Sequence, residues 1–502
     1  ANGQHPKQTE SERERKSGIE LGERVNTISA QVKASIFASA SFARAAVART
    51  VHRVARGQRP PLSLSSRRRR LSSKPLSKGV TGTTTRAMSS FQNLGFSSCF
   101  DSGNGKLVTI SDVGGLPIMR VNITNDPYTE VDGRAHKMWF HFKVSNLRGL
   151  QGKPLTVVLP NAGDCSYPGG WGGEALKGTP EGAAPYRACF SVDRQNWLRL
   201  NDTSYEDGEL RMTLDAKAEP ALEGADFVYL AYFAPYSQEQ HMDLMATVVA
   251  SSAKATVRTI GRTLDGADME LVTVRGSAKD EDAKKVWFIA RQHPGESQAS
   301  WWIDGFLRRL LDPSDPIANA LLAKAVVHVV PMMNPDGARR GYLRTNAAGA
   351  NLNREWQTPK LDYSPEVFHV LREMHEEGLD FCLDVHGDEA LPYNFIAGGE
   401  GCPCWSDRLA ALQKEWCDAY ERTNPDFQQV EGYPVDKPNE ANLAIGSNGM
   451  CQAFDALVMT MEMPFKDNAN APDMKVGWSA DRCRRLGEAA LDPTLAIVDK
   501  LR

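Results

Sequence analysis

The sequence predicts two folded domains: an antiparallel β-sandwich, followed by an α/β domain with a mixed, largely parallel central sheet flanked by helices. The chain has 502 residues, which is too long for one ordinary hydrophobic core. Over residues 91–251, short β-type segments follow one another without helical segments between them, as in a sandwich. Over residues 252–502, strand-like apolar runs alternate with helical segments, which indicates a mostly parallel sheet covered by helices.

The composition is that of a globular protein, with 41% hydrophobic and 24% charged residues. Its formal net charge of −3 combines two opposite parts. Residues 24–86 contain 14 Lys and Arg and no acidic residue, whereas residues 87–502 carry 41 basic and 57 acidic residues, a net charge of −16. An acidic body argues against nucleic acid as a partner. Because the sequence has no run of 18 apolar residues, it also predicts no membrane span.

Residues 1–90 form a basic extension for which we expect disorder. The extension is rich in Arg and Ser, and it contains the run Arg67-Arg68-Arg69-Arg70. Three interpretations stay open: an organelle transit peptide, a basic tail, or sequence upstream of a translation start at Met88. We expect a cytoplasmic protein, or a mitochondrial or plastid protein if the extension is a transit peptide.

The sandwich is expected over residues 91–251. Its strands are predicted from alternating or apolar segments over 118–123, 137–144, 155–159 and 227–233, which Gly, Pro, Asn and Asp separate. The Gly-rich run over 168–173 has no helix after it, so we interpret it as a loop and not as a phosphate-binding motif.

The α/β domain is expected over residues 252–502. Its strands are predicted over 269–274, 286–290, 326–330, 381–385 and 457–461, and its helices over 298–311, 317–324, 365–377, 404–420 and 479–501. Ligands of such domains bind beyond the carboxyl ends of the strands, so polar residues at those ends are the candidates for a site.

Nine cysteines occur at spacings that do not repeat. The odd number suits a reducing compartment and no disulfide framework. Cys402-Pro403-Cys404 resembles half of a metal site, but no second pair of cysteines stands at zinc-finger spacing.

His293 and Glu296 follow the predicted strand over 286–290, with a turn between them. A His and a carboxylate at a strand end are suitable zinc ligands, although an ordinary surface turn is the alternative interpretation. His386 ends the predicted strand over 381–385. Neighbouring parallel strands would bring it to the first pair, giving a His₂Glu zinc site with one open position.

Two further groups could serve such a site. Glu462 ends the predicted strand over 457–461, where it is either a general base beside the metal or an ordinary strand-end carboxylate facing water. Arg344, Asn353 and Arg354 lie in a loop rich in Gly and Asn. They suggest an anion site, because Arg offers paired hydrogen bonds to a carboxylate.

Five ordered motifs resemble the zinc metallocarboxypeptidases, and more narrowly the cytosolic carboxypeptidase subfamily with its bacterial relatives, which carry an N-terminal β-sandwich. The motifs are His293-Pro294-Gly295-Glu296, Asn334-Pro335-Asp336-Gly337, Asn351-Leu352-Asn353-Arg354, Asp384-Val385-His386-Gly387 and Thr460-Met461-Glu462-Met463-Pro464-Phe465. The resemblance covers roughly residues 96–500, including sandwich segments such as Phe100-Asp101-Ser102-Gly103-Asn104.

The resemblance implies a role for each candidate residue. His293, Glu296 and His386 would hold one Zn²⁺ per chain, and Glu462 would be the general acid/base for attack by a metal-bound water. Arg344 would polarise the scissile carbonyl, and Asn353 with Arg354 would bind the terminal carboxylate of the substrate. The expected partner is the C-terminus of a peptide or protein, with no nucleic acid and no membrane, and the sandwich could contact a protein substrate.

Three departures from the family pattern bear on specificity and geometry. Relatives that remove glutamate carry a basic residue about 16 positions before the catalytic Glu, whereas the segment over 444–449 has none, which argues against a glutamate preference. Asn351 stands where many relatives have an Asp that orients a zinc-bound His. No residue is identified as the mobile tyrosine of pancreatic relatives, although Tyr433 is close in sequence.

Two alternative functions stay open at this point. A zinc amidohydrolase acting on N-acyl amino acids would use the same ligands. A pseudo-enzyme that recruits a partner through its sandwich would lack bound zinc.

Overall fold

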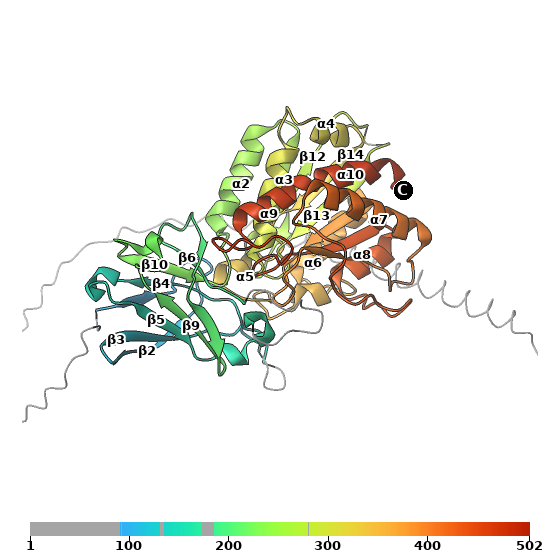
Figure 1. Ribbon diagram of the computed structural model, residues 1–502. Helices are drawn as coiled ribbons and strands as arrows, with labels where there is room; N and C mark the ends of the chain where they lie inside the picture. Colours follow the sequence, from blue (N-terminus) through green and yellow to red (C-terminus); the bar gives the residue numbers. More distant parts are fainter. Residues whose placement is uncertain (1–90, 92, 131–134, 173–184, 280) are drawn as a thin grey trace, which may run out of the picture. The chain divides into compact units, whose positions relative to one another are not determined.

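The computed structural model describes residues 91, 93–130, 135–172, 185–279 and 281–502. The predicted basic extension, residues 1–90, lies outside these residues. All of the described residues belong to one compact unit, whose strands and helices Figure 1 shows.

The N-terminal domain consists of two five-stranded sheets, which confirms the predicted sandwich. One sheet has the strand order β1-β4-β10-β6-β7 and the other β2-β3-β5-β9-β8. The strands are β1 Gly95–Ser97, β2 Lys106–Val113, β3 Leu116–Asn122, β4 His141–Ser145, β5 Leu155–Leu159, β6 Cys189–Ser191, β7 Leu198–Arg199, β8 Thr203–Glu206, β9 Glu209–Leu214 and β10 Phe227–Ala231.

One strand pair of the sandwich departs from the predicted antiparallel arrangement. β3 pairs with β5 in parallel, while the other pairs of both sheets are antiparallel. The chain leaves β3, contributes β4 to the other sheet, and then returns to its first sheet as β5. Because this connection crosses to the other sheet and is not a direct hairpin, β5 can lie parallel to β3.

The second domain contains a seven-stranded sheet of order β11-β12-β14-β13-β15-β17-β16. Its strands are β11 Ala255–Arg262, β12 Asp268–Val274, β13 Lys284–Ala290, β14 Ala325–Val330, β15 Phe381–Val385, β16 Phe395–Ala397 and β17 Leu457–Glu462. The four central strands, β14, β13, β15 and β17, are parallel, and the pairs at either edge are antiparallel. This is the predicted mixed sheet with a parallel centre.

Helices flank this sheet, as predicted. They are α2 Gln238–Ser251, α3 Ser297–Leu310, α4 Pro316–Leu322, α5 Pro335–Arg340, α6 Pro365–Glu377, α7 Asp407–Thr423, α8 Gly446–Phe454, α9 Ala480–Ala489 and α10 Leu491–Ile497. In Figure 1, α3 lies along α9, and α10 lies near α7. β14, β15 and β17 are wholly buried and β13 is buried from Val286 onward, so their near-continuous apolar sequences reflect cover on both faces.

The structure divides the single helix predicted over 479–501. α9 ends at Ala489, and α10 begins at Leu491. Pro493 has no backbone N–H to bond the carbonyl of Ala489, which explains why one continuous helix does not form here.

α2 was not predicted, because the segment before residue 251 was assigned wholly to β-structure. This helix contacts β11, α3 and α5 of the second domain, whereas the last sandwich strand ends at Ala231. Its start carries a capping box, in which the Ser237 hydroxyl accepts from the Gln240 N–H and the Gln240 side chain accepts from the Ser237 N–H. None of the described helices is both long and apolar enough to cross a membrane.

Candidate metal centre and active site

The carboxyl ends of three neighbouring parallel strands carry the main candidate residues. His293 follows β13, His386 follows β15 directly, and Glu462 is the last residue of β17. Glu296 stands at the N-cap position of α3, the helix that follows β13. Because β13, β15 and β17 are adjacent and parallel, their ends meet at one edge of the sheet.

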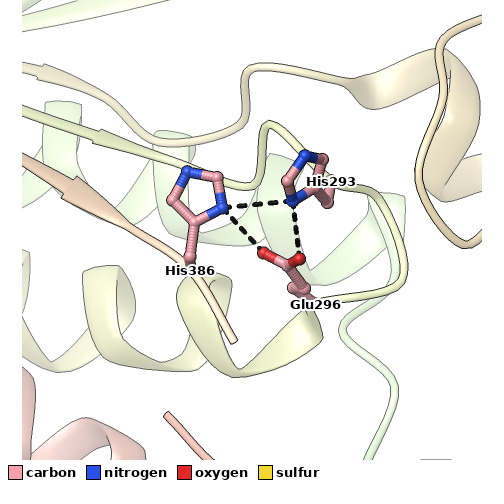
Figure 2. Close-up of side chains that lie close together, drawn as sticks. All are labelled: His293, Glu296 and His386. Carbon is pink, nitrogen blue, oxygen red and sulfur yellow. Dashed lines mark hydrogen bonds and ion pairs between the residues drawn. The ribbon is translucent and has the colours of Figure 1, made fainter. Parts of the chain in front are cut away.

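His293, Glu296 and His386 converge on one point (Figure 2). Nδ1 of His293 lies 2.6 Å from Oε1 of Glu296. Nδ1 of His386 lies 2.9 Å from Oε2 of Glu296 and 3.2 Å from Nδ1 of His293. Two imidazole nitrogens that face each other across a shared carboxylate are placed as ligands of one cation. Among the described residues, these three side chains form the group that could hold a metal ion, and their binding atoms all lie within 4.8 Å of one another.

Hydrogen bonds on the outer ring nitrogens orient both imidazoles. Nε2 of His293 lies 3.1 Å from Oδ1 of Asn351, and Nε2 of His386 lies 3.0 Å from a carboxylate oxygen of Asp384. If each Nε2 carries the proton and donates it to these acceptors, each Nδ1 presents a lone pair to the centre. Asn351 therefore occupies the orienting position with a neutral amide.

The charges around the three side chains favour a cation between them. Burial, together with the positive charge of Arg344, lowers the pKa of His293 to about 3, so its imidazole is neutral. Burial would raise the pKa of Glu296, but the two imidazoles lower it, so the carboxylate is ionised. Burial would lower the pKa of His386, but Asp384 and Glu296 raise it well above its ordinary value. Asp384 and Glu296 therefore favour a positive charge beside His386, and a bound divalent cation would supply that charge.

The donor set therefore fits zinc. With the cation in place of the proton on His386, two imidazoles and one carboxylate with orienting hydrogen bonds would form a three-ligand set that leaves a fourth position for water or substrate.

Glu462 lies in the same cavity and is 7% exposed. Its Oε2 has no hydrogen-bond partner among the described residues. Burial raises the pKa of Glu462 well above its ordinary value, with the negative charge of Glu296 adding to this effect and His386 opposing it. A buried carboxyl with one free oxygen and a raised pKa is suited to accept and return a proton.

The cavity has a volume of about 450 Å³. Glu462, Arg344 and further polar groups line it. Its acidic residues are Glu296, Asp388, Glu389, Glu400, Asp436 and Glu462, and its basic residues are Arg344 and Arg354. Ser447 and Asn448, from the segment without Lys or Arg, form part of the wall. The cavity is thus strongly acidic apart from the two arginines.

Arg344 lies in a loop that the sandwich domain holds in place. The Asp126 carboxylate, which is 1% exposed, accepts hydrogen bonds from the backbone N–H groups of Leu343, Arg344 and Thr345 at 2.7, 2.8 and 3.0 Å. The Arg344 guanidinium lies 5.9 Å from the ring centre of Tyr167, a second sandwich residue that lines the cavity. Two residues of the sandwich therefore fix the position of this arginine.

Asn353 and Arg354 also line the cavity. The side-chain oxygen of Asn353 accepts from the N–H of Gly446 at 2.7 Å, which leaves its NH₂ group as a donor. Burial, together with the positive charge of Arg344, lowers the pKa of Arg354. Since each arginine disfavours the charge of the other, an anion between them would be favoured.

Arg291 supports the turn that carries the first two ligands. It lies in the left-handed region with φ 65°, and it is fully buried. Its Nε donates to the carbonyl of Pro294 at 2.7 Å, and its Nη1 donates to the hydroxyl of Ser300 at 2.8 Å. A buried non-glycine residue with positive φ is strained, and such strain is often found at functional sites.

Sequence reasoning did not assign several residues that shape this site: Asp126, Tyr167, Arg291, Asp384 and Asp388. Asp384 is two residues before His386, so the Asp-x-His pattern was the available signal. No local signal pairs Asp126 with Arg344, which is 218 residues away. Tyr433 lines the cavity, and its hydroxyl donates to Asp388 at 2.5 Å.

The fold and the His/Glu/His group define a metalloenzyme-like α/β domain joined to a β-sandwich. Two family descriptions match the chain: Cytosolic carboxypeptidase N-terminal domain over residues 96–233, and Zinc carboxypeptidase over residues 241–389. The second match includes all three candidate ligands and ends before Glu462.

Known proteins agree with these matches. The metallo-carboxypeptidase structure from Burkholderia cenocepacia is 37% identical, covers 81% of this chain and 100% of that chain, and has a TM-score of 0.72. A Pseudomonas aeruginosa metallo-carboxypeptidase solved with (2-guanidinoethylmercapto)succinic acid has the same identity, coverage and TM-score. The protein ZMO1242 of Zymomonas mobilis is 42% identical over 72% of this chain and 88% of its own length.

The chain therefore belongs to the zinc carboxypeptidase family and carries a metallocarboxypeptidase domain. Among the cytosolic carboxypeptidases, human Cytosolic carboxypeptidase 4 is 28% identical over 54% of this chain, but the match spans only 26% of its own length.

Proposed function

We propose that this protein is a zinc-dependent exopeptidase that hydrolyses the C-terminal peptide bond of a peptide or protein, with His293, Glu296 and His386 holding one Zn²⁺. The observation that carries this proposal is the shared cavity. It is lined by the candidate ligands His293 and Glu296, by the buried carboxyl of Glu462 and by two arginines. The third candidate ligand, His386, lies 2.9 Å from Glu296 and precedes the lining residue Gly387. When bound, the zinc ion supplies Lewis-acid activation of water and of the scissile carbonyl.

Glu462 would move the protons of the reaction. Its carboxylate would accept a proton from the attacking water and then donate one to the leaving amine. The free Oε2 and the burial of the side chain support this role. Arg344, held by Asp126 and Tyr167, would donate to the developing oxyanion.

Asn353 and Arg354 would bind the terminal carboxylate of the substrate. The Asn353 NH₂ group and the Arg354 guanidinium are donors of two consecutive residues that both line the cavity. Binding that carboxylate restricts cleavage to the last peptide bond, because an internal segment has no such group.

Arg354→Ala is expected to raise KM for peptides with a free C-terminus by about tenfold to a hundredfold, because a hydrogen bond between charged groups contributes about 1.5–3 kcal/mol. Steady-state kinetics on a peptide series measures this. Arg262→Ala, which removes an exposed arginine paired with Asp268, is the matched control and should leave KM unchanged. An unchanged KM in Arg354→Ala would refute the role in carboxylate binding.

Asp126→Asn is expected to lower kcat by about tenfold or more, with KM changing less than kcat and zinc content unchanged. The amide keeps only one acceptor oxygen for three backbone donors, so the Arg344 loop loses its fixed position, and small misplacements of catalytic groups are costly. The exposed Asp164 of the sandwich provides the control variant Asp164→Asn. A lower unfolding temperature with normal kcat would show that Asp126 stabilises the fold without positioning Arg344.

We further infer that the removed residue carries a cationic or neutral side chain and not glutamate. Apart from Arg344 and Arg354, which have other roles in this proposal, the lining of the cavity offers carboxylates and uncharged groups. Half-buried Glu400 and exposed Asp436 would repel a glutamate side chain. The guanidino compound bound to the Pseudomonas aeruginosa relative supports a cationic side chain.

The test is a release assay with peptides that differ only in a C-terminal Lys, Arg, Glu, Leu or Phe, together with the corresponding N-acetyl amino acids. Lys and Arg should be released at least about tenfold faster than Glu at low salt, with the difference shrinking at high salt as the charges are screened. Preferential release of Glu would contradict the inference on specificity. Hydrolysis of N-acetyl amino acids alone would favour the amidohydrolase alternative.

The relatives named cytosolic carboxypeptidases support a cytosolic location for the two domains. Tyr167 supports direct contact between the sandwich and the substrate, because this sandwich residue lines the cavity.

A further inference from the structure

Three thiols that the proposed function does not use gather behind one wall of the cavity. Cys402 and Cys404 lie in the loop after β16, and Cys451 lies in α8. The same loop and the same helix contribute cavity-lining residues: Gly398, Glu400 and Gly401 from the loop, and Ser447 and Asn448 from α8. The Cys-Pro-Cys segment noted in the sequence therefore has a third cysteine beside it, from a distant part of the chain.

Cys404 and Cys451 are close enough to react with each other. The two Sγ atoms lie 3.6 Å apart, and Sγ of Cys404 lies 3.3 Å from the carbonyl oxygen of Cys451. A disulfide has an S–S distance of about 2.05 Å, so a small movement of the loop would bring the sulfurs to bonding distance. Within the described chain, the three sulfurs do not form a group compact enough to hold a metal ion. The group that does is His293, Glu296 and His386.

The surroundings distinguish Cys404 from the other cysteines. Cys404 is half-buried, whereas Cys451 is fully buried. A hydrogen bond from the Cys451 thiol, the largest cause, and the positive charge of Arg408 lower the pKa of Cys404. Burial raises the pKa of Cys382 and Cys483. Partial exposure and thiolate character are the properties of a cysteine that oxidants attack.

We propose that Cys404 and Cys451 are a redox-active thiol pair that a peroxide-class oxidant converts into a disulfide. With hydrogen peroxide, the Cys404 thiolate attacks one oxygen, the O–O bond breaks, and a sulfenic acid and hydroxide form. The hydroxide takes up the proton that the Cys404 thiol released on ionisation and leaves as water. The Cys451 thiol then attacks the sulfenic sulfur, the S–O bond breaks, and a second water leaves. Two thiols are oxidised to one disulfide, and the peroxide is reduced to two waters.

The disulfide would connect the two segments that form this wall of the cavity. It would draw the loop with Glu400 and Gly401 toward α8, whose first turn carries Ser447 and Asn448. This consequence rests on the proposed function, because the wall matters only if the cavity receives substrate. We expect kcat/KM for the preferred peptide to change at least about twofold on oxidation and to recover on reduction.

The experiment treats the full-length, zinc-loaded protein with a slight excess of hydrogen peroxide, blocks free thiols, and maps disulfides by mass spectrometry of a non-reduced digest. The expected product lacks two hydrogens and yields a cross-linked peptide pair containing Cys404 and Cys451, which dithiothreitol separates. Cys404→Ser and Cys451→Ser should not form it. Cys417→Ser, which changes another buried cysteine, should still form it.

A disulfide between Cys402 and Cys451, or oxidation of Cys404 that dithiothreitol cannot reverse, would overturn the pairing. A correct disulfide without any change in kcat/KM would overturn its link to the cavity wall. Because the mass measurement needs no peptidase activity, failure of the thiol pair and failure of the proposed function are distinguishable.

Discussion

Glu462→Gln is expected to lower kcat by about a thousandfold or more while leaving zinc bound. The amide has nearly the same shape as the carboxyl but cannot accept and return a proton, and general acid–base catalysis contributes about 10²–10⁴-fold. Glu462 lines the cavity with His293 and Glu296 but does not belong to the His293, Glu296 and His386 group that could hold the metal. The measurement is kcat on the preferred peptide, with metal content determined on the same sample.

The matched control is Glu376→Gln, which changes an exposed glutamate of α6. It should retain both zinc and turnover. If Glu462→Gln kept near wild-type turnover, the proton-transfer role would be wrong. If it instead lost zinc, Glu462 would be acting on the metal centre and not on the substrate.

His293→Ala is expected to abolish both zinc binding at micromolar free zinc and detectable turnover. The variant keeps one imidazole and one carboxylate, whereas a catalytic zinc site uses three protein ligands. It also leaves Asn351 without the imidazole that its side-chain oxygen orients toward the metal site. Metal analysis after dialysis measures the loss, and peptide release from the same sample measures activity.

His241 provides a close control for this variant. It is buried and forms a 2.7 Å pair with Glu270, but it lies on α2 and does not line the cavity. His241→Ala should lose some stability and keep a full equivalent of zinc. Retention of zinc by His293→Ala would show that the metal ligands have been assigned wrongly.

The strand ends that carry the site could be predicted because the central strands are long apolar runs. Such runs identify buried parallel strands, and parallel strands present their carboxyl ends together. His293, His386 and Glu462 each follow or end one of these runs. The structure places His293 and Glu462 in one cavity and His386 next to His293, although the three residues are far apart in sequence.

Other parts of the fold and the site depend on contacts between distant segments, which no single stretch of sequence shows. α8 begins with Gly446 and contains Gly449, so its local propensity gives no helix signal, and its contacts with β15 and β17 stabilise it instead. The support of Arg344 by Asp126 joins two domains, and neither segment indicates its partner. By contrast, the Ser237 and Gln240 capping box was visible in the sequence and marks the start of α2.

The structure also gives the sandwich a part in the active site. Besides Asp126 and Tyr167, the side chain of Arg199 donates to the carbonyls of Phe465 and Trp478, in the segment that follows Glu462. The N-terminal domain therefore holds the segment that contains Arg344 and the segment that follows Glu462, the two residues for which we propose catalytic roles. Variants on the sandwich side of these contacts should affect turnover although they lie outside the catalytic domain.

The most direct test of this account compares two peptides of identical sequence, one with a free C-terminal carboxylate and one with a C-terminal amide, incubated with zinc-loaded protein. We expect mass spectrometry to show loss of one residue from the free acid and little or no cleavage of the amide, with activity lost on chelation and restored by zinc. Equal cleavage of both peptides, or cleavage at internal bonds, would contradict a site in which Asn353 and Arg354 bind the terminal carboxylate beside the metal.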